Sequence, residues 1–403
     1  MSLTTRTSMP ISTALLTLIL GCLQAIMPLS IDLYLPGLPT IARDLHVSSG
    51  AVQSTLAVFL MGVALGQIAY GPVTDKYGRK RPLLAGLVIF VLGGILCALA
   101  PSITVLIAGR FLQALGASAS AVITAAIVRD LWSGKALADR LSILMLIMGV
   151  APILAPSLGG LILTQVGWHG LFWVLAAFGV LMTVTVVFLP ETSSAQERAD
   201  TRLRNAASNY LILLRNTPFM LYVLSGASMA GVLFAYLTGS SFLYIGTLGV
   251  SPGLFAVLFG VNAAGLILAS QLNRALLRRF GLYAVARTAV TAAVMMAALL
   301  LAVVISGHVT VFTLTPVLFF LLASIGCIFP NLAALAFGNV RERMGSASAV
   351  QGTTQSAIGA AAGGLVSAFS NGTVLPVAGI IAVFAVLSAL FLLAARRAGS
   401  PQR

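Results

Sequence analysis

Long apolar segments recur along the whole chain, and they constrain its fold more than any other feature. Each is about 20 residues long, which is the length that a helix needs to cross the hydrocarbon core of a bilayer. The segments lie near residues 12–34, 52–72, 82–100, 103–127, 141–164, 170–189, 218–241, 253–272, 284–306, 310–335, 347–369 and 375–395. Short polar or turn-forming breaks separate them. The pattern predicts an all-α integral membrane protein with twelve transmembrane helices.

The composition agrees with a membrane protein and excludes several other classes. Apolar residue types make up 59% of the 403 residues and charged types only 8%, against about 25% charged residues in a soluble domain. A disordered or nucleic-acid-binding chain would carry far more charge. The three cysteines, Cys22, Cys97 and Cys327, lie far apart within apolar segments. Their dispersal predicts neither a disulfide framework nor a metal site.

One break is longer than the others and divides the chain into two sets of six segments. It runs from Glu191 to Thr217 and is rich in charged residues, as is typical of a solvated linker. We therefore predict an N-terminal six-helix half over residues 1–190, a cytoplasmic linker over 191–217 and a C-terminal six-helix half over 218–403.

The basic residues indicate how these helices are oriented. The sequence has 23 Lys and Arg against 9 Asp and Glu, which gives a net charge of +14. With the N-terminus inside, 23 − 2 = 21 of the basic residues fall in cytoplasmic segments, and the two exceptions are Arg43 and Arg110. The positive-inside rule therefore predicts that both termini are cytoplasmic. It also explains the basic charge without nucleic acid as a partner.

Two short runs at corresponding places suggest that the halves are related. Asp75-Lys76-Tyr77-Gly78 follows the second apolar segment, and Arg278-Arg279-Phe280-Gly281 follows the eighth. Internal repeats are typical of transporters whose binding site lies between the halves. A channel would need rings of like charge, and an enzyme would need paired acids or a nucleophile with its base. Neither pattern is present, so we predict a carrier and not an enzyme.

Two ionisable side chains fall within the apolar segments rather than at their ends, Asp32 near the outer part of the first and Arg110 in the fourth. A charge at the bilayer centre costs about 2.5–3.5 kcal/mol on insertion scales and usually marks an ion or substrate path. A structural ion pair, or a hydrated Asp32 at the membrane surface, is the alternative. Burial favours a neutral carboxylate and a nearby cation favours the charged one, so Asp32 could gain and lose a proton. We predict that Asp32 and Arg110 couple transport to protons, without a cofactor.

Further polar residues in the apolar segments predict an amphipathic binding pocket. Gln24 lies eight positions before Asp32, and so close to the same helical face. Each of these residues could instead form a hydrogen bond between helices. The predicted substrate-binding residues are Gln24, Tyr34, Gln113, Tyr236, Tyr244, Asn262, Asn331 and Gln355.

Glycine and proline patterns predict the parts that move. Residues 71–81 are expected to form a tight basic turn, in which Asp75 caps a facing helix N-terminus, worth about 1 kcal/mol, or forms an ordinary loop salt bridge. Residues 149–160 hold two prolines four positions apart, which predicts a kinked helix that moves or faces the cavity. The predicted switch residues are Gly71, Asp75, Gly78, Arg79, Gly149, Pro152, Pro156, Gly159 and Gly160.

Several of these motifs together resemble one family of transporters. Residues 71–81 resemble the signature loop of the major facilitator superfamily, and residues 110–116 resemble its helix-4 motif. Residues 149–160 resemble the antiporter motif of its drug-export branches, with Ala155-Pro156 where the usual pattern has Gly-Pro. With residues 30–36 and 128–131 added, the combination resembles the bicyclomycin-resistance (Bcr/CflA) exporters.

The resemblance implies a twelve-helix antiporter of the bacterial inner membrane that exchanges small drugs for protons. Its substrates would be bicyclomycin, chloramphenicol-type compounds or sulfonamides. Asp32 takes the place of the helix-1 acid and Arg110 that of the helix-4 arginine. Gln24 stands where some related exporters have a second acid, which favours neutral or zwitterionic substrates over lipophilic cations. The alternative is proton-coupled transport of a small metabolite. The expected partners are drugs and the lipid bilayer, and a monomer would suffice because the pocket lies within one chain.

Overall fold

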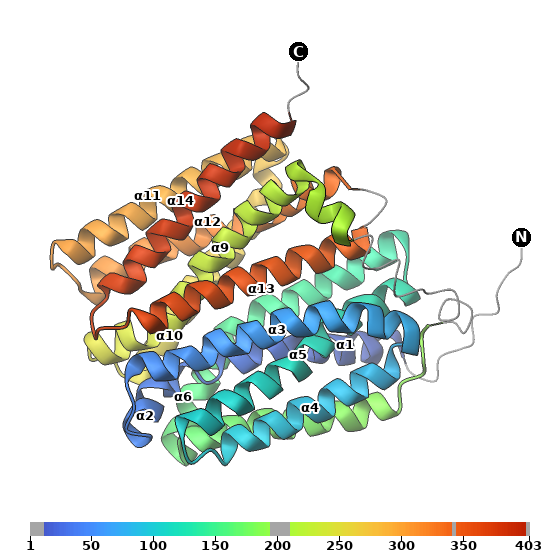
Figure 1. The fold of residues 1–403 in the computed structure, drawn as a ribbon, viewed down its shortest axis with the longest axis horizontal. Helices are drawn as coiled ribbons and strands as arrows, with labels where there is room; N and C mark the ends of the chain where they lie inside the picture. The colour runs from blue at the N-terminus through green and yellow to red at the C-terminus, as the bar shows by residue number, and fades with distance from the viewer. Residues whose placement is uncertain (1–11, 194–209, 341–343, 400–403) are drawn as a thin grey trace, which may run out of the picture.

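The structure is a computed structural model that describes residues 12–193, 210–340 and 344–399. This part of the chain is helical almost throughout and contains no strand (Figure 1). The elements of the first half are α1 (Thr13–Asp32), η1 (Leu35–Gly37), α2 (Leu38–Asp44), α3 (Ser49–Tyr77), α4 (Lys80–Ala98), α5 (Ile103–Leu131) and α6 (Gly134–Val187). Those of the second half are α9 (Thr217–Ser241), η2 (Phe242–Thr247), α10 (Pro252–Leu276), α11 (Leu282–Ile305), α12 (Val311–Gly338), α13 (Met344–Ala368) and α14 (Leu375–Gly399).

Ten helical segments of the described residues are long and apolar enough to cross a membrane. One of them lies in α6, which contains two predicted spans joined at Gly167, where φ is 74° and the backbone leaves the helical region. Glycine adopts such a positive φ without steric cost. α13 is 25 residues long but is not among the ten, because its many Gly, Ala, Ser and Thr residues make it less apolar. The predicted all-α membrane fold is confirmed.

Polar residues at the helix starts explain why the chain divides where it does. The side chain of Ser48 accepts a hydrogen bond from the Ala51 N–H at 3.2 Å at the start of α3, and Asn216 accepts one from Phe219 at 3.0 Å at the start of α9. Such N-caps satisfy backbone donors that have no partner within the helix. The apolar spans are therefore bounded by residues that stabilise a helix end.

The prediction of a turn over residues 71–81 is wrong for most of its length. α3 continues through Pro72 to Tyr77, and the chain turns only at Gly78 and Arg79 before α4. Backbone at Gly78 has a φ of 85°, a conformation that favours glycine. The helix outlasts its apolar part because its last turns leave the hydrocarbon region.

The two six-helix groups lie beside each other, with α3 packed against α13 and α6 against α10 (Figure 1). We name the end of the bundle that holds Gly78, the start of α9 and the end of α14 the linker end, which lies on the right in Figure 1. Residues 194–209 of the predicted linker lie outside the described residues, and the predicted division into domains stays a prediction.

Close backbone contact between α4 and α5 fixes the position of the helix that carries Arg110. A Cβ atom on Gly116 would contact the Phe90 backbone of α4, and one on Gly93 would contact the Gln113 backbone of α5. Small residues permit this approach in membrane helices. The close packing holds the buried part of α5 rigidly against its neighbour.

Candidate functional site

Asp32 lies at the last residue of α1, at the boundary between the two halves. Its side chain is only 4% exposed, and in the described part of the chain its carboxylate has no hydrogen-bond or ion-pair partner. The Tyr236 hydroxyl of the second half is near enough to interact with it electrostatically. A buried carboxylate without a partner is costly when ionised. A partner that approached this carboxylate would stabilise its ionised form.

Arg110 is fully buried within the first half, where aromatic rings take the place of a counterion. Its guanidinium carbon lies 4.2 Å from the Phe59 ring centroid and 4.3 Å from that of Tyr34. Its Nη1 donates to Gln113 Oε1 at 2.6 Å, while Nε and Nη2 have no partner. Desolvated cation–π contacts of this kind contribute about 2 kcal/mol each. The rings and Gln113 together hold a charge inside the membrane.

An ion pair between Asp32 and Arg110 is absent from the described structure, where the ion pairs found within 4.0 Å involve Arg79. Asp32 is at the boundary with the second half, whereas Arg110 is inside the first. The alternative of a structural ion pair is therefore wrong. Whether the two residues couple transport to protons stays a prediction.

Two predicted substrate-binding residues belong to the surroundings of Arg110. Tyr34 is fully buried, and its hydroxyl lies 3.0 Å from Thr55 Oγ1. Gln113 is also fully buried and accepts the hydrogen bond from Arg110. In this conformation they position the guanidinium of Arg110, and neither lines the cavity between the halves at the linker end.

Of the predicted polar residues of the second half, two are paired with each other, and two others have partners outside the predicted set. Asn262 Nδ2 donates to the Tyr236 hydroxyl at 3.1 Å, and its Oδ1 has no partner. The Tyr244 hydroxyl lies 3.0 Å from Thr315 Oγ1.

The other two residues of this group lie apart from Asp32. Asn331 donates to Asn273 Oδ1 at 2.7 Å, and Gln355 faces a small space near Gly226. Tyr236 is thus the residue of this group with an interaction with Asp32, and Asn262 contacts Tyr236.

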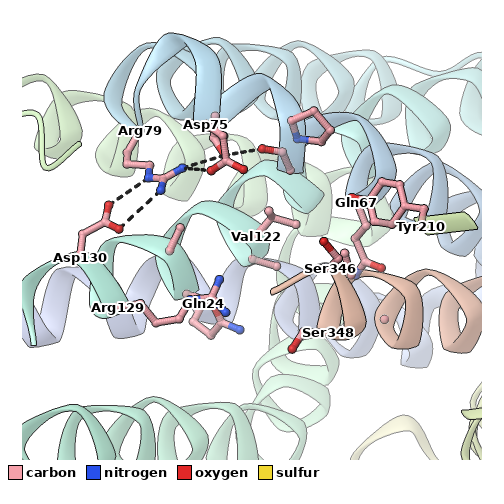
Figure 2. Close-up of a pocket in the computed structure, with 18 residues that line it drawn as sticks. Gln24, Gln67, Asp75, Arg79, Val122, Arg129, Asp130, Tyr210, Ser346 and Ser348 are labelled. Carbon is pink, nitrogen blue, oxygen red and sulfur yellow. Dashed lines mark hydrogen bonds and ion pairs between the residues drawn. The ribbon is translucent and has the colours of Figure 1, made fainter. Parts of the chain in front are cut away.

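A cavity of about 540 Å³ lies at the linker end, between α1, α3 and α5 of the first half and α13 of the second (Figure 2). Gln24 and Gln67 line it, and the side-chain oxygens of both are buried without a partner. Gln24 is the one predicted substrate-binding residue among its lining residues. Asp32 lies eight residues further along α1, about 12 Å away along the helix axis. The cavity therefore stops short of Asp32 in this conformation.

Charged residues line the mouth of this cavity (Figure 2). Arg79 Nη1 lies 2.6 Å from Asp75 Oδ1, and Arg79 Nε lies 2.9 Å from Asp130 Oδ2 at the end of α5. Asp75 thus forms a salt bridge, as in the alternative to a helix cap, but it lies in the last turn of α3 and not in a loop. Asp130 was not predicted as a site residue, although the sequence places this acid beside Arg129 at the end of a span.

Glu191 ties the end of α6 to the start of α4. Its carboxylate accepts hydrogen bonds from the backbone N–H of Arg79 at 2.8 Å and Lys80 at 3.1 Å, and from those of Thr192 and Ser193. Partial burial raises the pKa of Glu191, but these four backbone donors outweigh it and hold the pKa below its usual value. Sequence reasoning missed this role because Glu191 begins the charged linker.

The remaining switch residues lie on α3 and α6. Gly71 lines the cavity, and Pro152 and Pro156 lie inside α6. A Cβ on Gly160 would lie 3.6 Å from the Pro252 carbonyl oxygen of the other half, and one on Gly149 would lie 3.5 Å from Ile267. Gly159 packs instead against the Leu33 backbone of its own half. Gly149 and Gly160 therefore allow α6 to lie close to α10, and their role in movement of the halves stays a prediction.

The halves also meet at the end opposite the linker. Ser367 Oγ of α13 donates to the Gly50 carbonyl oxygen of α3 at 2.6 Å. A hollow of about 210 Å³ also lies at this end, between α3, η2 and the start of α14, but the cavity of about 540 Å³ at the linker end is larger. The arrangement is that of a carrier more open from the linker end. The fold and the site together define a two-half membrane carrier.

Comparison with known proteins identifies the family. The profile of the Major Facilitator Superfamily matches residues 20–364. YdgK of Bacillus subtilis, described as an uncharacterized transporter of this superfamily, is 37% identical over 382 residues, which cover 93% of this chain and 94% of YdgK. A bicyclomycin resistance protein homolog of Haemophilus influenzae is 32% identical and covers 94% of this chain and 96% of its own length. The chain therefore belongs to the Major Facilitator Superfamily.

Further comparisons agree with this assignment. The multidrug resistance protein MdtL of Escherichia coli is 34% identical over 59% of this chain and 60% of its own length. Among solved structures, a mutant of the nucleoside transporter NupG has a TM-score of 0.73 at 14% identity, covering 96% of this chain and 100% of its own. A D-xylose–proton symporter has a TM-score of 0.71 at 14% identity, covering 94% and 97%. At this identity the structures indicate the fold alone. The predicted family is confirmed, and so is the prediction of a transporter and not an enzyme.

Proposed function

We propose that the protein is a proton-coupled exporter of small neutral or zwitterionic antibiotics that works by alternating access. The proposal is supported by relatives named for bicyclomycin and multidrug resistance. It is carried by Asp32, a buried carboxylate without a partner at the boundary between the halves. Among the described residues, it is the one acid within the predicted spans.

In this proposal, Asp32 carries the proton, and the interaction between Asp32 and Tyr236 of the second half changes with the charge of Asp32. An ionised Asp32 attracts a hydrogen bond from the Tyr236 hydroxyl, which Asn262 already contacts at 3.1 Å. A protonated Asp32 no longer does so, and the link between the halves weakens. Substrate and proton then compete, because each one favours a different arrangement of this boundary. In this proposal Arg110, held by Gln113 and its aromatic rings, supplies the fixed positive charge inside the first half.

We place the protein in the bacterial inner membrane with both termini and the linker end in the cytoplasm. The proposal follows from the distribution of basic residues, 23 − 2 = 21 of which fall on that side. The cavity at the linker end would then admit substrate from the cytoplasm, as an exporter requires. A monomer suffices for this cycle because both walls of the cavity belong to one chain.

The test is drug flux in proteoliposomes under an imposed pH gradient, with wild type, Asp32→Asn and the matched control Asp44→Asn. Asp44 lies at the end of α2 and accepts a hydrogen bond from Trp168 Nε1 at 3.0 Å, which an amide oxygen can also accept. The substrates are a neutral phenicol, bicyclomycin, a sulfonamide and a cationic dye. We expect gradient-driven flux to disappear in Asp32→Asn alone, and the drug binding that remains in this variant to no longer depend on pH.

Voltage provides an independent check on the stoichiometry. If one proton enters for each neutral drug that leaves, each cycle moves one charge, and 100 mV contributes about 2.3 kcal/mol. A flux of neutral drug that does not change with the membrane potential would contradict this exchange. Unchanged flux in Asp32→Asn would make Asp32 structural, and a panel without any transported member would favour a small metabolite as substrate.

A further inference from the structure

A second hollow of about 540 Å³ lies on the outer surface of the second half, away from the boundary between the halves. It runs between α10, α11 and α12, and α11 lies at the edge of the bundle (Figure 1). We name it the α11 groove. Leu276 and Phe280 line its linker end, and Ala284, Thr288, Ala292 and Met296 follow one face of α11. The small Ala side chains of α11 leave space between the helices, and this space forms the groove on the surface that faces the membrane.

The length of the α11 groove along the helix is close to the thickness of the hydrocarbon layer of one leaflet. From Ala284 to Met296 the helix advances twelve residues, or about 18 Å at 1.5 Å per residue. The hydrocarbon of one leaflet is about 15 Å deep, half of the bilayer core. The groove begins at the loop between α10 and α11 and ends near the middle of these helices. A single acyl chain lying along α11 would fill it over its whole length.

The linker end of the α11 groove carries positive charge without an internal counterion. Arg278 and Arg279 are exposed and lie in the loop between the lining residues Leu276 and Phe280. Neither forms an ion pair with a described residue. From residue 201 to the end of the chain, Glu342 is the only acidic residue in the sequence. The second half therefore cannot neutralise these arginines with its own described carboxylates.

We propose that the α11 groove binds an anionic phospholipid, with one acyl chain along residues 284–296 and its phosphate at Arg278 and Arg279. The apolar furrow accounts for the chain, and the unpaired arginines account for the headgroup charge. A second copy of this protein fits the face poorly, because two copies meeting there would bring their arginine pairs together. The lipid would hold the linker ends of α10 and α11 at the membrane surface.

The headgroup is tested by native mass spectrometry of the delipidated full-length protein with phosphatidylglycerol or phosphatidylcholine of identical chains. An arginine near the membrane surface contributes roughly a fivefold preference for anionic lipid, so two give roughly 25-fold. We expect Arg278→Gln/Arg279→Gln to lose this preference. The matched control is Arg81→Gln/Arg215→Gln, which removes the same charge from two exposed residues outside this face and should retain the preference.

The acyl-chain position is tested by cross-linking with phosphatidylglycerol that carries a photoactivatable group in its chain. We expect cross-links in wild type to map to residues 284–296, and Ala292→Phe, which fills the groove, to abolish them. Equal binding of both lipids, equal losses in the two arginine variants, or cross-links spread evenly over the lipid-facing helices would overturn the proposal. A dimer mass that disappears in Ala292→Phe would assign the groove to a second copy instead.

Discussion

Replacing Phe59 with leucine tests whether aromatic rings stabilise the buried charge of Arg110. Phe59 is fully buried on α3, and its ring centroid lies 4.2 Å from the guanidinium carbon. The cation has one hydrogen bond, to Gln113, while two of its nitrogens have none. Leucine keeps most of the volume of phenylalanine but has no π face. The substitution therefore removes the electrostatic contact and little else.

The expected loss follows from two contributions. A phenylalanine-to-leucine change in a packed core costs less than about 1.5 kcal/mol, and a desolvated cation–π contact contributes about 2 kcal/mol. We expect Phe59→Leu to destabilise the protein by about 3 kcal/mol. Phe90→Leu is the matched control, because Phe90 is also fully buried in the first half and has no such contact with Arg110. It should lose only the packing contribution, about 1 kcal/mol.

A double-mutant cycle separates the two contributions. Phe59→Leu, Arg110→Met and the double variant are compared by their unfolding midpoints in one detergent, followed by tryptophan fluorescence. Without the guanidinium, the Phe59 ring makes no cation–π contribution. The coupling energy between Phe59 and Arg110 should therefore be about 2 kcal/mol, and the same cycle with Phe90 should give a coupling energy near zero. Equal costs for Phe59→Leu and Phe90→Leu, or no coupling with Arg110, would refute the reasoning.

Two further predictions concern the turn between α3 and α4, and both are checked by thermal unfolding in detergent. Glu191→Ala should cost about 1–2 kcal/mol at neutral pH, after discounting its charged hydrogen bonds for partial exposure. Because the folded-state pKa of Glu191 lies below its usual 4.5, this contribution is complete above about pH 4.5 and disappears as the pH falls through the folded-state pKa. Glu191→Gln should lack this acid dependence, and an unchanged acid profile would contradict it. Gly78→Ala should cost about 1–2 kcal/mol because φ is 85° and the new Cβ meets Glu191. Gly253→Ala, in the first turn of α10 without a positive φ and with nothing within 4 Å, should not destabilise the protein, and equal losses at both positions would exclude strain as the cause.

The spans could be predicted from the sequence because the bilayer requires about 20 apolar residues of any helix that crosses it. The helix ends could not, because apolarity reports only the part inside the hydrocarbon. α3 continues to Tyr77 and α5 to Leu131, several residues beyond the apolar segments at 52–72 and 103–127. Their polar last turns remain helical outside the membrane, where composition no longer distinguishes a helix from a loop.

The candidate site could be predicted in part. The burial of Asp32 and Arg110 follows from their place in apolar segments, but their separation depends on the direction of each side chain. The contact of Phe59 with Arg110 could not be predicted, because phenylalanine is common in membrane helices and nothing in the sequence distinguishes this one. Glu191 is separated from Arg79 by 112 positions along the chain, so the contact between α6 and α4 requires the tertiary structure. The roles of Tyr236 and Asn262 in transport stay predictions.

The contact between the halves at the end opposite the linker has a consequence for the rate at which this end opens during transport. Ser367 meets the Gly50 backbone there, and Gly160 approaches the Pro252 carbonyl. Glycine has no side chain to reorient, and serine has a short one, so the halves can part without slow repacking of long side chains. At these two contacts, opening this end exchanges one hydrogen bond with water and moves no long side chain, which lowers their contribution to the activation barrier. We expect the turnover rate to depend on substrate and proton exchange rather than on this end.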